Sequence, residues 1–365
     1  MKNTTLTTEL SIPKFTSGYF ILGLKFILLL ILFFLGTNIL LVAVRELAQE
    51  TLLSKVILYQ SYQPFLAFFI GIILTAILHS CNLLGAIAII LVSAKILDTS
   101  SAIAALIGIN IGTTINPMLV SFGHIMRKKN FRKALSASML HILLNFLPSI
   151  LLLPFIYQAE YLFKAYFFPS RFSSWWSFNL WGEQYIENFL QNIGLLSYPL
   201  LLLFSAIAIL FGVLVLAKLF FKEKIASIIN QRIRKESKEN IAIAIIASFI
   251  LYSKSFIIKY LINSISNNKA SLKQLLPWLL GANIGTAFTL LLASWGHSEQ
   301  AIHIAFLYFS FSFFPAFLFI SAYLQNKFIW LARYLGGMMH RYHLASFLYV
   351  LIFFFILPLL LIYLF

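Results

Sequence analysis

The chain has 365 residues, of which 61% are hydrophobic and 10% are charged, and its mean hydropathy is +0.92. Because a soluble domain carries roughly a quarter charged residues, this composition excludes an ordinary soluble protein and predicts an all-α polytopic membrane protein. The formal net charge is +16. The basic residues lie in short loops beside apolar runs, where the cytoplasmic preference of Lys and Arg explains them, so no nucleic-acid partner is expected. The single cysteine, Cys81, excludes an intrachain disulfide.

In chain order, several apolar runs reach the roughly 20 residues that a helix needs to cross a membrane. These runs are 18–43, 134–157, 193–221, 301–324 and 344–365. The first is too long for the core of a signal peptide, which has roughly 7–15 residues, and is expected to be a retained span. The stretches 56–126 and 241–296 are apolar but interrupted by short polar sequences. We expect them to form broken helices or re-entrant hairpins that line a cavity or pack within the protein.

The interruptions occur as two related pairs. GINIGTT (108–114) recurs as GANIGTA (281–287), and the polar sequences HSCN (79–82) and YSKS (252–255) precede them. One offset, 173 residues, relates both pairs. Such a duplication predicts a transporter built from two repeats around a central site.

Two basic loops, 127–133 and 222–238, give the orientation. Two predicted spans separate them, so both loops are expected in the cytoplasm and the segment 158–192 outside. The first repeat then ends in the cytoplasm and the second begins there, which predicts inverted topology. The loop 222–238 is typical of a solvated amphipathic helix. In 158–192, Trp175, Trp176 and Trp181 are expected to anchor the chain at the membrane interface, although a ligand-stacking platform is an alternative.

These features divide the chain into five parts. They are an N-terminal segment with the first span (1–55), repeat one (56–160), an outer aromatic segment with a connecting span and basic loop (161–240), repeat two (241–325) and a C-terminal transmembrane segment (326–365).

The GINIGTT and GANIGTA sequences supply neutral hydrogen-bonding groups beside glycines. Glycine permits close backbone approach or unwound geometry, and amides and hydroxyls can bind both an anion and a hard cation. The alternative is packing of small residues between helices. The polar residues at these two places are Asn110, Thr113, Thr114, Asn283 and Thr286.

HSCN places His79, Ser80 and Asn82 directly after an apolar run, where an unpaired polar group would cost free energy. Thr75 lies four residues before His79 on the same predicted helical face, and Ser248 has the equivalent place in repeat two. His79 is either a hydrogen-bonded interior residue or a proton carrier.

YSKS contains Lys254 between Ser253 and Ser255, deep within an apolar segment. A lysine at a helix centre costs about 2.5–3.5 kcal/mol on insertion scales and marks a functional site or pathway by default. The alternative is that its side chain extends to water at one membrane face. If it is buried, its ammonium could face an anionic substrate or occupy the place of a bound Na⁺.

Enzyme signatures such as HExxH, GxSxG and a P-loop are missing from the sequence, so no enzyme, catalytic residue or bound metal is predicted. No acidic pair lies within an apolar run, which argues against a carboxylate proton relay. Asp98 is interpreted as a helix cap. His340 and His343 are interpreted as basic loop residues before the last span.

On these residues the chain resembles the type II sodium/phosphate cotransporter family. GIILTAILHSCN followed by ALIGINIGTT is similar to the first unit of that family, and IAIAIIASFILYSKS followed by LLPWLLGANIGTA is similar to the second. His141 and Asn145 resemble a His/Asn helix that follows the first motif. The similarity covers roughly residues 60–150 and 240–315.

The resemblance implies two inverted repeats, each with a QSSS sequence near a hairpin tip and a GANIGTT-like segment after it. HSCN and YSKS stand where the QSSS sequences would, and only Ser80, Ser253 and Ser255 keep the family residue. The Asn and Thr residues are better preserved, although Ala287 replaces a Thr. The implied substrate and ion site therefore comprises His79, Ser80, Asn82, Asn110, Thr113, Thr114, Ser253, Lys254, Ser255, Asn283 and Thr286.

The expected function is that of a secondary transporter in the cell (inner) membrane that moves phosphate or a related oxyanion, with sodium as the coupling ion and no other cofactor. Because serine ligands are lost, Lys254 is expected to supply positive charge near the anion and to reduce or remove one Na⁺ requirement. The alternatives are a non-transporting membrane partner or sensor and a transporter of a phosphorylated lipid or organic anion. The expected partners are the anion, sodium and the lipid bilayer, and a homo-oligomer is left open.

Overall fold

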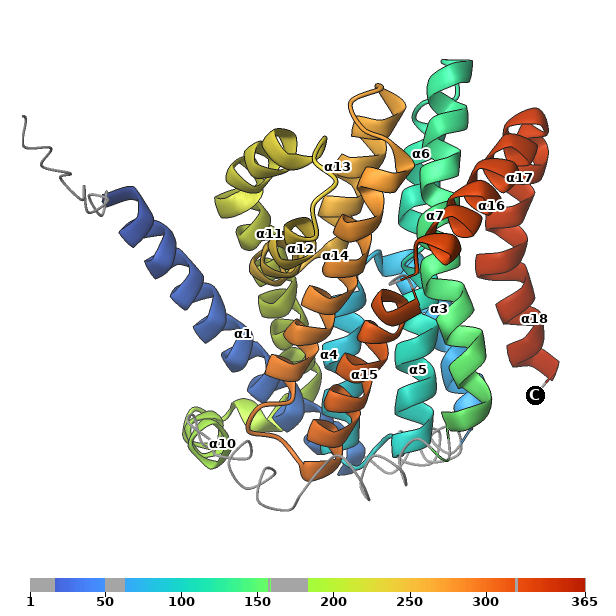
Figure 1. The fold of residues 1–365 in the computed structure, drawn as a ribbon. Helices are drawn as coiled ribbons and strands as arrows, with labels where there is room; N and C mark the ends of the chain where they lie inside the picture. Colours follow the sequence, from blue (N-terminus) through green and yellow to red (C-terminus); the bar gives the residue numbers. More distant parts are fainter. Residues whose placement is uncertain (1–16, 50–62, 157, 159–182, 319–320, 365) are drawn as a thin grey trace, which may run out of the picture.

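The computed structural model describes residues 17–49, 63–156, 158, 183–318 and 321–364. Every regular element in this part of the chain is helical, and it contains no strand (Figure 1). The all-α prediction is therefore confirmed. The α-helices are α1 (Ser17–Gln49), α3 (Pro64–Leu78), α4 (Cys81–Ser93), α5 (Thr99–Gly112), α6 (Ile115–Phe122), α7 (Lys128–Leu152), α10 (Glu183–Asn192), α11 (Pro199–Arg232), α12 (Glu239–Ile250), α13 (Lys254–Ser266), α14 (Leu272–Ala293), α15 (Glu299–Leu318), α16 (Ala322–Arg341), α17 (His343–Leu351) and α18 (Leu357–Leu364).

Seven segments in the described residues are long and apolar enough to cross a membrane, so the chain is a multi-pass membrane protein. They are Phe20–Ala48, Thr99–Phe122, Lys128–Phe155, Pro199–Arg232, Leu272–Ala293, Glu299–Phe317 and Ser346–Leu364. Two of them, Thr99–Phe122 and Leu272–Ala293, correct the expectation that all of 56–126 and 241–296 consists of pieces too short to span. The predicted run 301–324 is also interrupted, because α16 begins at Ala322 as a separate amphipathic helix.

The other helices in those two stretches are short, as predicted. α3 has 15 residues, α4 and α13 have 13 each and α12 has 12. At 1.5 Å per residue the longest reaches about 22 Å, less than the roughly 30 Å of a hydrocarbon core. The breaks fall at HSCN and YSKS, where His79 and Tyr252 adopt left-handed conformations with φ of 55° and 47°. We call residues 79–82 the first tip and residues 252–255 the second tip.

The predicted duplication extends to the backbone. The four described non-glycine residues with positive φ form two pairs, His79 with Tyr252 and Lys95 with Asn268, and the members of each pair lie 173 positions apart. The same offset relates the residues that cap α4 and α13, Ser80 and Ser253, and those that cap α5 and α14, Asp98 and Ser271. Asp98 accepts hydrogen bonds from the amides of Ser100 and Ser101, which confirms its predicted role.

Glycines bring two pairs of helices into backbone contact. A Cβ atom added to Gly108 would lie 2.0 Å from the carbonyl oxygen of Phe68, and one added to Gly281 would lie 2.3 Å from that of Ile241. One turn later, a Cβ atom added to Gly112 or to Gly285 would again meet a backbone carbonyl oxygen of the partner helix. In each pair that oxygen belongs to the residue four positions after the one met by the first glycine. Because both contacts advance in the same direction, α3 runs parallel to α5, and α12 runs parallel to α14.

The same sequences were expected to permit unwound backbone, and this is wrong for the second copy. The whole of GANIGTA is helical within α14. In the first copy the helix ends at Gly112, and a turn at Thr113 and Thr114 leads into α6. The glycines therefore serve the helix packing that was the alternative interpretation, because the absent side chains let neighbouring backbones approach.

Several connections between helices lie at two ends of the helical body (Figure 1). In this view the loop that enters α5 and the short helix α10 lie at the lower end. The α6–α7 turn and the loop that enters α14 lie at the upper end. The predicted basic loop 127–133 is not a loop beyond Arg127, because residues 128–133 form the first turns of α7. Of the predicted outer segment, Tyr185 is exposed on α10, whereas Trp175, Trp176 and Trp181 lie outside the described residues.

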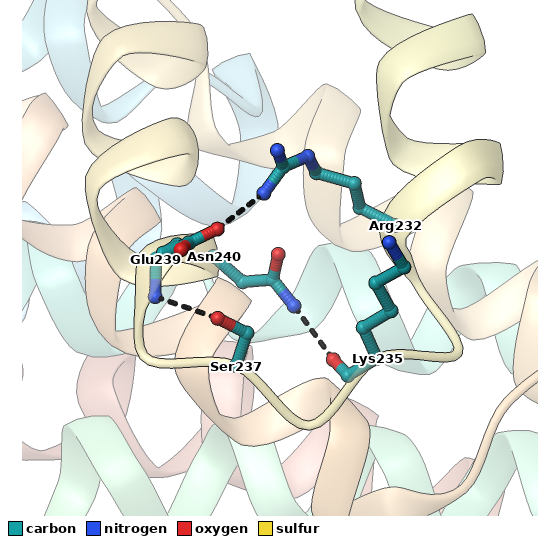
Figure 2. A network of polar contacts seen from close by, with 5 residues as sticks. All are labelled: Arg232, Lys235, Ser237, Glu239 and Asn240. Atoms are coloured by element: carbon teal, nitrogen blue, oxygen red, sulfur yellow. Dashed lines mark hydrogen bonds and ion pairs between the residues drawn. The ribbon is translucent and has the colours of Figure 1, made fainter.

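The second basic loop is tied to the start of α12 (Figure 2). Arg232 at the end of α11 pairs with Glu239 at 2.7 Å, the Asn240 amide donates to the carbonyl of Lys235 at 2.8 Å, and the Glu239 amide donates to the Ser237 hydroxyl at 3.2 Å. Most of 222–238 continues α11 as a helix. The network fixes the turn by which α11 passes into repeat two.

Candidate functional site

The ammonium of Lys254 lies where the two repeats meet. Its Nζ donates to the side-chain oxygen of Asn110 in repeat one at 2.5 Å and to that of Asn283 in repeat two at 3.0 Å. The residue is 1% exposed. The alternative in which this lysine extends to water is therefore wrong. A positive charge from one repeat is held by a pair of asparagines that the 173-residue offset relates.

The chemistry of lysine fixes how the two amides point. An ammonium has donors only, so the oxygen of each asparagine faces it and the amide nitrogen points elsewhere. Neither nitrogen has a hydrogen-bond partner among the described residues, and both asparagines are buried. The centre thus combines one cation with two amide donors whose hydrogen bonds are not used by the protein.

Asn116 joins the two tips. Its side-chain nitrogen donates to the Ser255 hydroxyl at 3.3 Å and approaches the backbone oxygen of His79 at 3.5 Å. The first tip and the second tip therefore belong to one polar region rather than to remote faces. Sequence analysis did not select Asn116, which lies two residues after the end of GINIGTT.

Two helices begin at the tips with different caps. In the first tip, the Ser80 hydroxyl accepts from the amide of Leu83 at 3.4 Å. In the second tip, Ser253 caps α13 without a side-chain hydrogen bond. Helix N-termini attract anions through their free amides and their dipole. The N-terminus of α13, where Lys254 is the first residue, therefore has more free amide donors for an anion than the N-terminus of α4.

The threonine hydroxyls donate within their own helices. Thr113 donates to the Asn110 carbonyl at 2.6 Å, Thr114 to the Ile111 carbonyl at 2.7 Å and Thr286 to the Ala282 carbonyl at 3.0 Å. All three are buried. With their protons engaged in this way, the oxygens can act only as acceptors, which suits a cation rather than an anion.

Two further buried amides lie in repeat one. The Asn82 side-chain oxygen accepts from the Cys81 thiol at 3.4 Å, and its nitrogen has no partner among the described residues. The Asn145 nitrogen lies 3.1 Å from Nε2 of His141 and 2.7 Å from the His141 carbonyl. The Nδ1 of His141 and the side-chain oxygen of Asn145 are likewise without a partner there. A buried polar atom without a partner is costly, so each marks a place that a ligand or water can satisfy.

Most of the predicted site residues are buried. Of the predicted site residues, His79 has an exposed side chain, Ser80 is half-buried and the others are buried. No group of three or more His, Cys, Asp or Glu side chains in the described residues is arranged to hold a metal ion.

Comparison with known proteins finds sequence similarity over part of the chain. Residues 32–160 match the family model described as Na+/Pi-cotransporter. A stretch of 99 residues is 30% identical to the sodium-dependent phosphate transport protein 2B of Homo sapiens and to protein 2A of Rattus norvegicus. It covers 27% of this chain, 14% of the human protein and 16% of the rat protein. No solved structure matches the chain significantly.

The fold and the buried polar centre define a multi-pass α-helical membrane protein. Over residues 32–160, which include the first tip and GINIGTT, the predicted resemblance to the sodium/phosphate cotransporter family is confirmed. The second tip and GANIGTA lie outside the matched segment and are linked to the first copy by the offset and the shared backbone geometry.

Proposed function

We propose that this protein is a secondary transporter of inorganic phosphate or a related oxyanion in the cell membrane, and not an enzyme. The observation that carries the proposal is the ammonium of Lys254, held between Asn110 and Asn283 with two amide donors beside it. A buried cation with neighbouring donors and a helix N-terminus is a suitable environment for an oxyanion. The partial similarity to sodium-dependent phosphate transport proteins supports the same substrate.

We further propose that the two repeats are inverted in the membrane and alternate access around this centre. In support, the loops that enter α5 and α14 lie at opposite ends of the helical body (Figure 1). The two helices have matching caps and pack in parallel on α3 and α12 in matching ways. A site between inverted repeats can open to either side by the same motion.

Lys254 acts in this proposal as a tethered cation. Carbonyl-type oxygens are the ligands that hard cations prefer, and the two asparagine oxygens hold the ammonium as they could hold a Na⁺ ion. An ammonium attached to the chain makes one such ion unnecessary. We therefore expect transport to need one Na⁺ fewer than it would without this lysine, or none.

Opening must break the contacts that cross between the repeats. These include the Lys254–Asn110 hydrogen bond and the Asn116–Ser255 hydrogen bond. Both are polar contacts that an arriving anion and its water can replace. Substrate binding would thus lower the cost of separating the tips.

The test is uptake of radiolabelled phosphate into proteoliposomes of the full chain, with a sodium gradient and with potassium in place of sodium. We expect saturable uptake that is only weakly dependent on sodium, and we expect Lys254→Ala to lose uptake or to become sodium-dependent. Lys259→Ala, which removes a lysine from the same helix, is the control. Uptake and sodium dependence that remain unchanged in Lys254→Ala would contradict the role of this lysine.

A second candidate function follows from the altered tips, in which few QSSS residues remain. A protein with this buried centre could serve as a membrane partner or sensor that binds phosphate without moving it. Binding of phosphate without uptake would favour that function. A binding screen of phosphate, sulfate, arsenate and organic phosphates, run in Na⁺ and in K⁺, separates the oxyanion from a phosphorylated lipid or organic anion as substrate.

A further inference from the structure

A second positively charged site lies away from Lys254, at the end of the molecule that carries the basic loop 127–133. A cavity of about 470 Å³ opens there between α7, α16 and the loop that enters α14. Its nine lining residues include four cations and no carboxylate. The cations are Lys129, Arg132, Lys133 and Arg333.

The cavity has a rigid back wall. α7 and α16 approach so closely that a Cβ atom added to Gly336 would lie 2.6 Å from the backbone nitrogen and the hydroxyl oxygen of Ser136. Ser136 lines the cavity, is buried, and donates to the Arg132 carbonyl at 3.0 Å. The two arginines therefore project from helices whose separation is fixed by backbone contact.

The floor of the cavity is formed by residues of repeat two. Ser271 and Leu272 line the cavity where α14 begins, so a helix N-terminus adds its positive end to the four cations. Lys133 donates to the side-chain oxygen of Asn268, and the Asn130 amide donates to that of Asn267 at 3.4 Å. These contacts join α7 to the loop before α14 and hold the cavity together.

The positive charges around the cavity are not balanced by acidic side chains in its lining. Arg132 and Arg333 have no acidic partner among the described residues, whereas nearby Lys273 pairs with Glu236 at 3.1 Å. Four like charges around one space repel each other, and an anion placed among them removes that repulsion. Arginine binds phosphate oxygens bidentately, so two arginines on adjacent helices suit a phosphate group best.

We propose that this cavity binds a phosphate-bearing anion, supplied either as the headgroup of an anionic phospholipid or as free phosphate. Basic pockets between transmembrane helices on the cytoplasmic side are suited to lipid headgroups. The position of the basic loop predicts that this end is cytoplasmic. The bound anion would stabilise the contact between α7 and the loop that enters α14, independently of transport at Lys254.

The test uses thermal unfolding of the full chain in uncharged detergent, with cardiolipin, inorganic phosphate or phosphatidylcholine added. We expect cardiolipin or inorganic phosphate to raise the Tm by about 5 °C at saturation, because a ligand that binds only the folded state stabilises it. Phosphatidylcholine, which has no net charge, is expected to leave the Tm unchanged. Protection by cardiolipin alone assigns the site to a lipid headgroup. Because phosphate is also the proposed ligand at Lys254, protection by inorganic phosphate assigns the cavity to a free anion only when the arginine variant described next loses that protection.

The deciding variant is Arg132→Gln with Arg333→Gln, and the control is Lys128→Gln with Lys327→Gln. Each removes one cation from α7 and one from α16, but the control residues do not line the cavity. The Arg pair should lose most of the Tm shift while the control keeps it. Equal shifts in both variants, or no shift in the wild-type protein with either anion, would overturn the proposal. If the Arg variant fails to fold, the wild-type comparison of cardiolipin with phosphatidylcholine decides.

Discussion

The two tips have the same backbone and different chemistry. Both begin with a left-handed residue followed by a serine that caps the next helix. The first tip then has Cys81, and the second has Lys254 at the position 173 residues later. The first tip is partly exposed and its serine makes the cap hydrogen bond, whereas the second is buried and its serine does not. The comparison shows that two repeats with the same backbone can place one charged side chain, Lys254, at their shared centre without a charged counterpart in the other repeat.

The strongest test of this comparison moves the charge between the tips. Lys254→Cys should reduce phosphate uptake by about 30-fold or more, since removing one member of a buried charged contact costs about 2–5 kcal/mol. The double variant Cys81→Lys/Lys254→Cys should recover at least about a tenth of wild-type uptake, because neighbouring positions couple non-additively. Initial uptake rates in proteoliposomes measure both. A double variant no better than Lys254→Cys would show that the two tips are not interchangeable.

The glycine contacts test whether the repeats pack alike. Gly108→Ala and Gly281→Ala should each destabilise the protein by about 2–4 kcal/mol, because the added methyl would collide with a backbone carbonyl that cannot move away. Gly212→Ala, in α11, is the control, since nothing lies within 4 Å of the added atom. That control should be neutral or slightly stabilising. Thermal unfolding in detergent measures all three, and a tolerant Gly281 would contradict the matched packing.

Substitution of the two asparagines tests whether each of them stabilises the buried ammonium of Lys254. Asn110→Ala and Asn283→Ala should each cost about 1–3 kcal/mol of stability, because each leaves the buried ammonium of Lys254 one acceptor short. In a Lys254→Met background, which removes the ammonium, the same substitutions should cost less. Comparing the Tm values of the four variants with those of their parent proteins gives the difference. Equal costs in both backgrounds would mean that the asparagines do not support the charge.

The helix caps provide the smallest test. Asp98→Ala and Ser271→Ala should each cost about 1 kcal/mol, the usual contribution of an N-cap. Asp98 accepts from two amides, while Ser271 forms a reciprocal capping box with Gln274, so the two effects should be similar despite the different residues. Ser237→Ala, which removes the hydroxyl that accepts from the Glu239 amide in the basic loop, is a reference of the same chemical kind. If the two stability losses differ by more than about 1 kcal/mol, the N-caps of α5 and α14 do not contribute equally to the two repeats.

Much of this architecture is predictable from the sequence because its signals are local. Long apolar runs predict spans, and the polar tips predict breaks, since a helix interrupted in an apolar environment needs replacement hydrogen bonds. Asp98 is recognisable as a cap from its position before an apolar helix. One wrong prediction concerns GANIGTA, whose glycines were expected to permit unwinding. Its helix stays intact because α12 packs against it, and a contact of that kind cannot be inferred from the sequence around Gly281 alone.

The candidate site is only partly predictable. Lys254, Asn110 and Asn283 were each identified as candidates, but their convergence depends on how two sequence-distant segments cross. Asn116 was missed for the same reason, because its partners Ser255 and His79 lie on the two tips rather than on its own helix. A useful signal was available in the sequence, since Asn116 is a second asparagine only six residues after Asn110.

The burial of Lys254 has an electrical consequence. A charge attached to the chain can be displaced with its helix but cannot be released, so a conformational cycle that moves this ammonium would carry it out and back through the membrane potential. Moving one elementary charge across the full field is worth about 2.3 kcal/mol per 100 mV. Such a cycle would respond to voltage and produce transient currents, while the lysine itself would contribute nothing to a steady current.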